Sequence, residues 1–253
     1  MATGRTTLNN YRVYIDGYDM SGYSRSFGPL SCTFEEGVDD AVSLPVKATW
    51  PGNAVIGMGT LNGIFDNTAT SGIHATQSAV SLKRTVIVAA GIQGAPANND
   101  PAFCGQFVQT GYEAGPSENP VTATIPFANT SGLASNLNYA RPWGTLLLAP
   151  AAKTAANSAT GIDQTASTSL GGYMCYQIFA GNGTAAIKVQ DAATNSDGSF
   201  ADLLSTGTIS CSTPTADIVA LAKNATARRY IRWQIALGTA TTVTFALVWV
   251  RGN

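Results

Sequence analysis

Four carboxylates lie within six residues of this sequence, at Glu35, Glu36, Asp39 and Asp40. Two carboxylates can act as a general acid and a general base when they come from separate elements and face the same cleft. Four acids this close in one segment repel one another, so the cluster needs solvent or a cationic partner around it. The spacing therefore fits an exposed loop or an acidic contact surface better than a catalytic pair.

Other motifs that could support catalysis or metal binding are incomplete. His74 is the only histidine, and without a G-x-S-x-G motif no nucleophile–base–acid triad can be assembled. The stretch Asp191–Ser199 resembles a calcium loop, but an EF-hand alignment of its Asp-Gly pair puts Ala193 and Leu204 at the first and last ligand positions. The glycines of Gly57–Gly63 have the wrong spacing for a dinucleotide loop. We predict a protein that is not an enzyme and has no metal and no cofactor.

The cysteines and the N-terminus indicate an intracellular site of synthesis. No cysteine pair has zinc-ligand spacing, and we expect all four to be buried thiols: Cys32, Cys104, Cys175 and Cys211. The N-terminus lacks the apolar core of a secretory signal, and no apolar stretch is long enough to span a membrane. We expect synthesis in a cytoplasm and no membrane partner.

The chain is unusually poor in charge. Charged residues make up 11% of the sequence, against roughly 25% in a typical soluble domain, and the formal net charge is −1. Copies of such a chain repel one another weakly, which favours association. The only close basic group is Arg228, Arg229 and Arg232, so no basic patch for nucleic acid is evident.

Alternation of apolar and polar residues with a period of two runs through the chain and predicts an all-β fold. The clearest segments are 11–15, 121–127, 229–237 and 243–249. In the last two, Trp233 and Trp249 fall among aliphatic residues and are expected in the core. Tyr230 falls on the opposite face and is the better candidate for a surface contact, such as one with a glycan.

One short helix and one domain boundary are also predicted. The helix is expected in "DNTATSGIHATQSAV", capped by Asp66 or Thr68. Residues 150–171 are small, polar and aperiodic, which is typical of a linker or a long surface loop. We therefore divide the chain into two β domains, residues 1–145 and 146–253.

The first half, residues 8–130, resembles the tail tube (major tail) proteins of long-tailed bacteriophages. The resemblance rests on the order of "VYIDGYDMSGY", "GPLSCTFEE", an arm, and the element Leu61–Asp66 directly before a helix start. It implies a β-barrel or β-sandwich with one short helix and a long arm between early strands. It also implies hexameric rings that stack into a tube, through whose lumen DNA passes without specific binding.

This resemblance gives the acidic segment a role between subunits. The arm would cross to a neighbouring copy and bury apolar groups worth roughly 1.5–3 kcal/mol each. Its acids would either face the lumen and repel DNA or pair with cations across the interface, and their position beside the apolar arm favours the interface. The expected contact residues are Glu35, Glu36, Asp39, Asp40, Val42, Leu44, Val46, Lys47 and Trp50.

The second half resembles a galactose-binding-like or discoidin-like jelly roll. The resemblance rests on "AAIKVQDAATNSDGSFADLL", "RRYIRWQIAL" and "TVTFALVWVRG". It implies an outward β-sandwich that decorates the particle, and it leaves an alternative open: a phage adhesin or capsid decoration protein that binds a host-surface glycan. In the main hypothesis the protein is a structural component of the virion tail, assembled in the host cytoplasm, whose partners are itself and other tail proteins.

Overall fold

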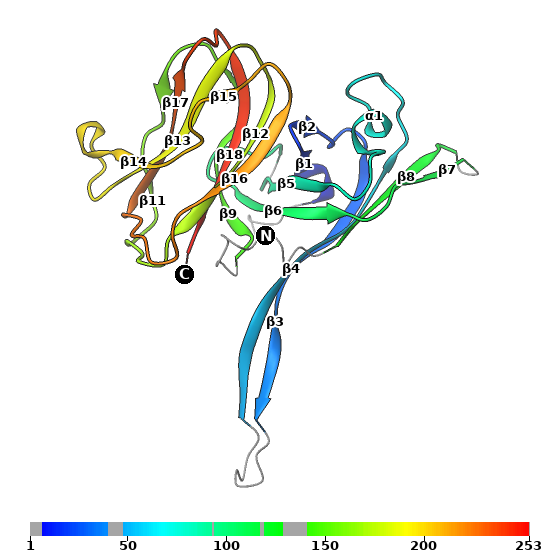
Figure 1. The fold of residues 1–253 in the computed structure, drawn as a ribbon, viewed down its shortest axis with the longest axis horizontal. Coiled ribbons are helices and arrows are strands. Elements are labelled where there is room, and N and C mark those ends of the chain that lie inside the picture. The colour runs from blue at the N-terminus through cyan, green and yellow to red at the C-terminus, as the bar shows by residue number, and fades with distance from the viewer. Residues whose placement is uncertain (1–6, 40–47, 93, 117–118, 129–140, 253) are drawn as a thin grey trace.

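The computed structural model describes residues 7–39, 48–92, 94–116, 119–128 and 141–252 of the 253-residue chain; the side chains of residues 8, 37–39 and 48–53 are not described. The described chain is all-β apart from the short helix α1 (Ile73–Gln77) and the 3-10 turns Leu8–Asn10 and Asp197–Ser199. The predicted fold class is therefore confirmed. The strands form two antiparallel sheets (Figure 1).

The larger sheet has twelve strands, and its main path runs β16-β12-β18-β9-β6-β5-β1-β2. Its members are β1 (Tyr11–Ile15), β2 (Tyr18–Asp19), β3 (Ser24–Asp39), β4 (Ala48–Ile64), β5 (Lys83–Ala90), β6 (Pro101–Gln109), β7 (Glu113–Gly115), β8 (Thr122–Ala128), β9 (Trp143–Lys153), β12 (Gly172–Gly181), β16 (Thr215–Ala220) and β18 (Val243–Arg251). The smaller sheet has six strands: β10 (Asn157–Ser158), β11 (Ile162–Asp163), β13 (Thr184–Ala192), β14 (Ala201–Ser205), β15 (Ile209–Ser210) and β17 (Tyr230–Leu237).

Three hydrophobic cores lie between successive layers of strands. The first-half core lies between β1, β5 and β6 on one side and β4, β8 and α1 on the other, and includes Val88, Phe107 and Ile125. The central core joins β1, β5 and β6 to β9, β12 and β18, and includes Ile87 and Cys175. The second-half core fills the space between the other face of β9, β12 and β18 and the smaller sheet; it includes Trp233, Trp249, Phe245 and Ile187.

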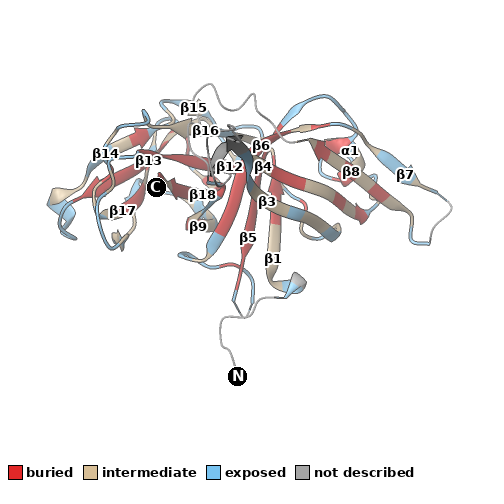
Figure 2. Ribbon diagram, turned by 90° about the horizontal axis from the view of Figure 1, so that it is seen from below, coloured by how far each residue is buried: buried red, intermediate tan, exposed pale blue. Residues whose placement is uncertain are grey.

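Strands that lie between two cores are buried on both faces, so buried residues follow one another without the alternation of a half-exposed strand. In β5 every residue from Arg84 to Ala90 is buried, and in β12 every residue from Gly172 to Ile178 is buried. Figure 2 shows these buried residues gathered in the middle of the molecule, whereas β7 and β14 at the two ends are largely exposed or intermediate. The predicted core positions of Trp233 and Trp249 are confirmed, with exposed fractions of 4% and 1%.

Strand β9 crosses the boundary predicted at residue 145. The first residues of β9 pair with β6, where Trp143 lies opposite Phe103. Along most of its length β9 also pairs with β18, where Ala151 lies opposite Phe245. The segment expected as a linker contains the end of β9 and the short strands β10 and β11, both paired with β17. The larger sheet thus continues through the boundary, and the division into two domains stays a prediction.

The helix lies where it was predicted, but its capping differs. The N-cap is Gly72, without a side-chain cap, so the prediction of Asp66 or Thr68 as the cap is wrong. Asp66 instead stabilises the preceding turn: its carboxylate accepts a hydrogen bond from the Thr68 amide at 2.6 Å, and its carbonyl accepts one from the His74 amide.

Three of the four cysteines are buried as predicted. Cys104 and Cys175 lie in the central core and Cys211 in the second-half core. The prediction is wrong for Cys32, which is only partly buried because it lies on β3 beyond the cores. None of the four forms a disulfide.

Candidate assembly surface

Strands β3 and β4 form a long two-stranded ribbon. They pair antiparallel from Ser24 opposite Gly63 to Asp39 opposite Ala48, with register shifts between Ser24 and Ser26 and between Phe34 and Glu36. In Figure 1 the ribbon leaves the layered body and projects well beyond it. The sequence predicted an arm at this place, but as a segment between strands, and it did not predict that the arm is itself an extended pair of strands.

Most of the ribbon has no neighbouring strand. Strand β8 pairs with β4 only along Thr60–Ile64, and in the described part of the chain β3 pairs only with β4. Outside Thr60–Ile64, the outer edges of the ribbon therefore have no third strand of the described chain to pair with, and a strand edge of this kind can accept a further strand. A two-stranded ribbon is only marginally stable in water by itself, so a ribbon of this length gains stability from any surface that covers it.

The ribbon is packed at its base and exposed farther along. Phe27, Leu30 and Ile56 pack against the first-half core, and the rings of Tyr11 and Phe27 meet edge to face at 5.3 Å. Beyond this base the Phe34 side chain is 52% exposed. Sequence reasoning did not select Phe34, although an aromatic residue directly before an acidic pair was a usable signal.

Two of the nine predicted contact residues are fully described. Glu35 and Glu36 are exposed and lie within β3, so the interpretation of these two acids as part of a loop is wrong. Asp39 and Trp50 lie in the paired strands, but their side chains are outside the described residues. Asp40, Val42, Leu44, Val46 and Lys47 also lie outside the described residues. Contact with a second subunit stays a prediction for all nine.

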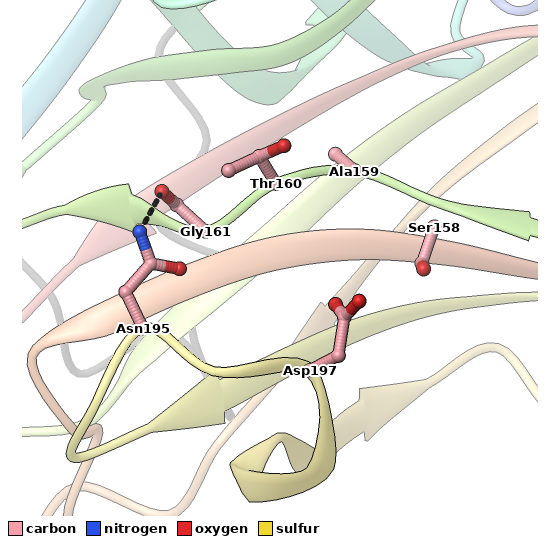
Figure 3. A pocket seen from close by; sticks show the side chains of 6 residues that line it. All are labelled: Ser158, Ala159, Thr160, Gly161, Asn195 and Asp197. Carbon is pink, nitrogen blue, oxygen red and sulfur yellow. Dashed lines mark hydrogen bonds between the residues drawn. The ribbon is translucent and has the colours of Figure 1, made fainter.

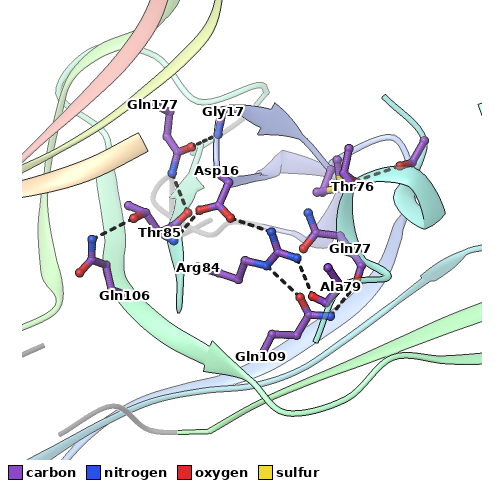
Figure 4. Close-up of polar contacts among 12 residues, drawn as sticks. Asp16, Gly17, Thr76, Gln77, Ala79, Arg84, Thr85, Gln106, Gln109 and Gln177 are labelled. Atoms are coloured by element: carbon purple, nitrogen blue, oxygen red, sulfur yellow. Dashed lines mark hydrogen bonds and ion pairs between the residues drawn. The ribbon is translucent and has the colours of Figure 1, made fainter. Parts of the chain in front are cut away.

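A buried polar network lies in the first half, where the β1–β2 turn meets β5 and β6 (Figure 4). Asp16 and Gly17 both have positive φ and form the two-residue turn between β1 and β2, as the Asp-Gly pair predicts. This turn aims the Asp16 carboxylate at Arg84, whose Nη1 lies 3.0 Å from Oδ2. Arg84 also donates to the Gln109 side chain at 2.9 Å and to the Ala79 carbonyl at 2.8 Å. The fold fixes the positions of these acceptors. Arg84 therefore has a structural role.

The same network reaches the layer of β12 and β16. The Gln177 side chain accepts a hydrogen bond from the Gly17 amide and donates to the Thr85 carbonyl at 2.9 Å. The Gln106 side chain donates to the Thr85 hydroxyl at 3.0 Å and to the Asp217 carboxylate at 2.7 Å. These bonds tie strands from the first half to strands from the second.

The three clustered arginines each have their own carboxylate. Arg228 binds Asp191, Arg229 binds Asp163 and Arg232 binds Asp197, with shortest distances of 2.6, 2.6 and 2.7 Å. Two of these aspartates belong to the stretch Asp191–Ser199, so its acids hold arginines. Among the described residues no three His, Cys, Asp or Glu side chains gather closely enough to hold a metal ion.

The other residues considered for chemistry lie apart from one another. His74 is half-buried, with Nδ1 3.2 Å from the Tyr112 hydroxyl. Tyr230 is half-buried, with the Arg229 guanidinium 5.1 Å from its ring centre. Over the residues that are described, no helix has the length and apolar character to cross a membrane.

Comparison with known proteins found a distant structural likeness and no match in sequence. No protein-family model and no curated protein matches the sequence. Among solved structures, the chain is similar to the Dit protein (gp 19.1) of SPP1, described as a paradigm of the hub adsorption apparatus in phages that infect Gram-positive bacteria. The two share 7% identity with a TM-score of 0.32, over 95% of this chain and 98% of that one. This likeness is too low to place the chain in a family.

Proposed function

We propose that this protein is a structural subunit of a bacteriophage tail and that it binds copies of itself through the β3–β4 ribbon. The observation that carries the proposal is the projecting ribbon, which exposes Phe34 and which, apart from the pairing of Thr60–Ile64 with β8, has no third strand beside it among the described residues. The resemblance of residues 8–130 to tail tube proteins supplies the form of assembly, in which rings stack into a tube around a lumen for DNA. The second-half sandwich would then lie outside the tube.

The chemistry of the ribbon supports self-association. A strand from a second copy that pairs with either open edge would extend the sheet, and each added backbone hydrogen bond contributes about 0.5–1.5 kcal/mol. Phe34 adds apolar area that is half exposed in the isolated chain. The low net charge leaves little repulsion between copies.

The exposed acids Glu35 and Glu36 are compatible with two positions in such an assembly. They would repel phosphate if they faced a lumen, or pair with a Lys or Arg of a neighbouring copy if they lay in an interface. We favour the interface because both acids directly follow Phe34 on β3.

Excision of the ribbon tests this function. Residues 34–54 are replaced by Asn-Gly, a two-residue turn that connects Thr33 to its partner Val55. Because the base of the ribbon and the three cores are retained, the variant should fold with an unchanged thermal midpoint. We expect rings or tubes from the full chain, and monomers from the variant, in sedimentation velocity and electron microscopy. A full chain that stays monomeric at high concentration, or a variant that still forms tubes, would contradict the proposal.

A further inference from the structure

An arginine and a tryptophan are exposed together at the start of β9. Arg141 and Trp143 are exposed on either side of the buried Pro142, so their side chains lie on one face of this extended segment. Trp143 is 41% exposed, whereas Trp233 and Trp249 are buried. Tryptophan and arginine are enriched among the residues that anchor protein interfaces. We call Arg141 and Trp143 the Arg–Trp face.

The fold holds the backbone of the Arg–Trp face in place. The Trp143 ring meets the Phe103 ring of β6 edge to face, with ring centres 5.5 Å apart. The carbonyl oxygen of Arg141 accepts a hydrogen bond from the Tyr173 hydroxyl at 2.8 Å. A partner would therefore meet a segment that is already ordered, which lowers the entropic cost of binding.

The Arg–Trp face lies beside the place where the ribbon leaves the body. The pairing of β3 with β4 is regular from Leu30 to Phe34, so Leu30, Cys32 and Phe34 share one face of β3. Leu30 packs against the first-half core, to which Phe103 also belongs. Burial raises the pKa of the Cys32 thiol, and the positive charge of the nearby Arg141 opposes this rise. This face of the ribbon and the Arg–Trp face are therefore neighbours.

The exposed part of the ribbon has side chains that complement the Arg–Trp face. Phe34 and Glu36 are two residues apart on β3 and both exposed, and the register shift between them adds a residue to β4 rather than to β3. They therefore share a face, at the same spacing as Arg141 and Trp143. An antiparallel alignment would place Phe34 of one copy on Trp143 of another and Glu36 on Arg141.

Most other carboxylates of the described residues already have partners in their own chain. Asp197, for example, bonds Arg232 beside a hollow of the second half lined by residues 158–161, 195 and 197 (Figure 3). Among the described residues, the carboxylates with neither a hydrogen bond nor an ion pair are those of Glu35, Glu36 and Glu113. Of these three, only Glu35 and Glu36 follow a large apolar side chain that is mostly exposed, that of Phe34.

We propose that the Arg–Trp face of one copy binds the β3 strand of a second copy's ribbon, with Phe34 against Trp143 and Glu36 paired with Arg141. The inference rests on the proposed self-association through the ribbon and adds the surface that the ribbon binds. An aromatic pair and an arginine–carboxylate pair supply apolar contact and charge-assisted hydrogen bonds. Each copy would give one ribbon and receive another, which is a heterologous contact that can close into a ring.

Exchange of the two charges tests this pairing in the full chain. Arg141→Glu and Glu36→Arg each place like charges opposite one another in every interface, so each should weaken self-association by more than about tenfold. A chain that carries both substitutions has opposite charges again, and its association should return to within about threefold of the unaltered chain. Sedimentation equilibrium measures all four chains.

Two matched controls reverse exposed charges at other places. Lys83→Glu makes the same change of charge at the start of β5, and Glu113→Arg makes the opposite change at the start of β7. Both should leave self-association unchanged. Thermal midpoints of all the variants should match that of the unaltered chain, because each substituted side chain is exposed.

Each outcome decides the question. Weakening by both single substitutions, with recovery in the combined chain and no effect of the controls, supports the pairing. An effect of only one single substitution, no effect of either, or no recovery in the combined chain overturns it. In those cases the proposed function still holds if excision of the ribbon abolishes assembly. A full chain that stays monomeric overturns this inference and the proposed function together.

Discussion

Charged side chains of the described residues serve mainly to hold strands together, and their burial decides how much each pair stabilises the fold. The Arg84 side chain is 8% exposed and its partner Asp16 25%, whereas Lys188 and Asp202 are 25% and 46% exposed. Removing one partner of a buried pair leaves an uncompensated charge and broken hydrogen bonds. An exposed pair is screened by solvent and contributes little.

We therefore expect Arg84→Met to lower the free energy of unfolding by about 3 kcal/mol, because Asp16, Gln109 and Ala79 all lose their donor. The control Lys188→Met should cost less than about 1 kcal/mol. Urea denaturation of both variants measures the difference. Equal losses in the two variants would show that the buried network does not act as described.

Burial also controls the ionisation of the three tyrosines that are buried among the described residues. Burial, as the largest cause, raises the pKa of Tyr176 to about 12, and it likewise raises the pKa of Tyr14 and of Tyr173. In the unfolded chain a tyrosine titrates near pH 10. The folded state therefore retains these protons longer, so their contribution to stability is complete below about pH 10 and is lost as the pH rises toward about 12.

The expected result is a free energy of unfolding that falls above about pH 10, by up to about 1.4 kcal/mol per pH unit for each of the three phenols. Denaturant titrations at a series of alkaline pH values measure this slope, and Tyr176→Phe should reduce it. Near-ultraviolet absorbance should show at least three of the nine tyrosines titrating only with unfolding, namely the three buried ones among the described residues. Ionisation of all nine near pH 10 in the folded protein would refute the assignment.

At the level of elements, the sequence predicted individual strands well but not their partners. The period of two in segment 229–237 places Ile231, Trp233 and Ile235 in the second-half core, where the structure has them. Strands β5 and β12 are buried on both faces, and an apolar run alone does not reveal which two layers cover it. The acidic segment was expected as an exposed loop because four neighbouring carboxylates repel one another and need solvent, whereas Glu35 and Glu36 are exposed within a strand.

The candidate functional residues also differ in whether the sequence alone could reveal them. The acidic segment and Tyr230 could be selected from the sequence because each stands out against its neighbours. A hollow lined by residues 158–161 and by residues 195 and 197 could not be selected, because these residues come together only where β17 pairs with β10 and β11 on one edge and with β13 on the other. The partners of the three clustered arginines were hidden for the same reason, since Arg228 and Asp191 are 37 residues apart.

A single residue tests the role of the ribbon as an element. Phe34→Ser changes a side chain that is 52% exposed, so the stability of the isolated chain should change by less than about 0.5 kcal/mol. If Phe34 is buried in an interface, self-association should weaken more than about tenfold, because aromatic anchors carry much of the free energy of binding. Sedimentation equilibrium measures this change.

The matched control for this substitution is Val80→Ser. Val80 is 45% exposed and lies outside the ribbon, in the turn that follows α1. It should leave both folding and association unchanged. Equal association of the Phe34→Ser variant and the full chain would exclude Phe34 from the interface.

The whole molecule combines a layered body with a projecting ribbon. The larger sheet continues from the first half into the second through β9, and the central core buries strands from both halves against each other. The body is thus stabilised within one chain, whereas the outer part of the ribbon has no described cover. In self-assembly the body would fold within one chain, and the ribbon would gain its stability by contact with a neighbouring copy.

The most direct test of this account is a cryo-electron microscopy map of the assembled protein. We predict that residues 34–54 of each copy lie against a second copy, with Phe34 covered and an outer edge of β3 or β4 facing the neighbouring subunit. An assembly in which this ribbon contacts only its own body, or only solvent, would contradict the central claim.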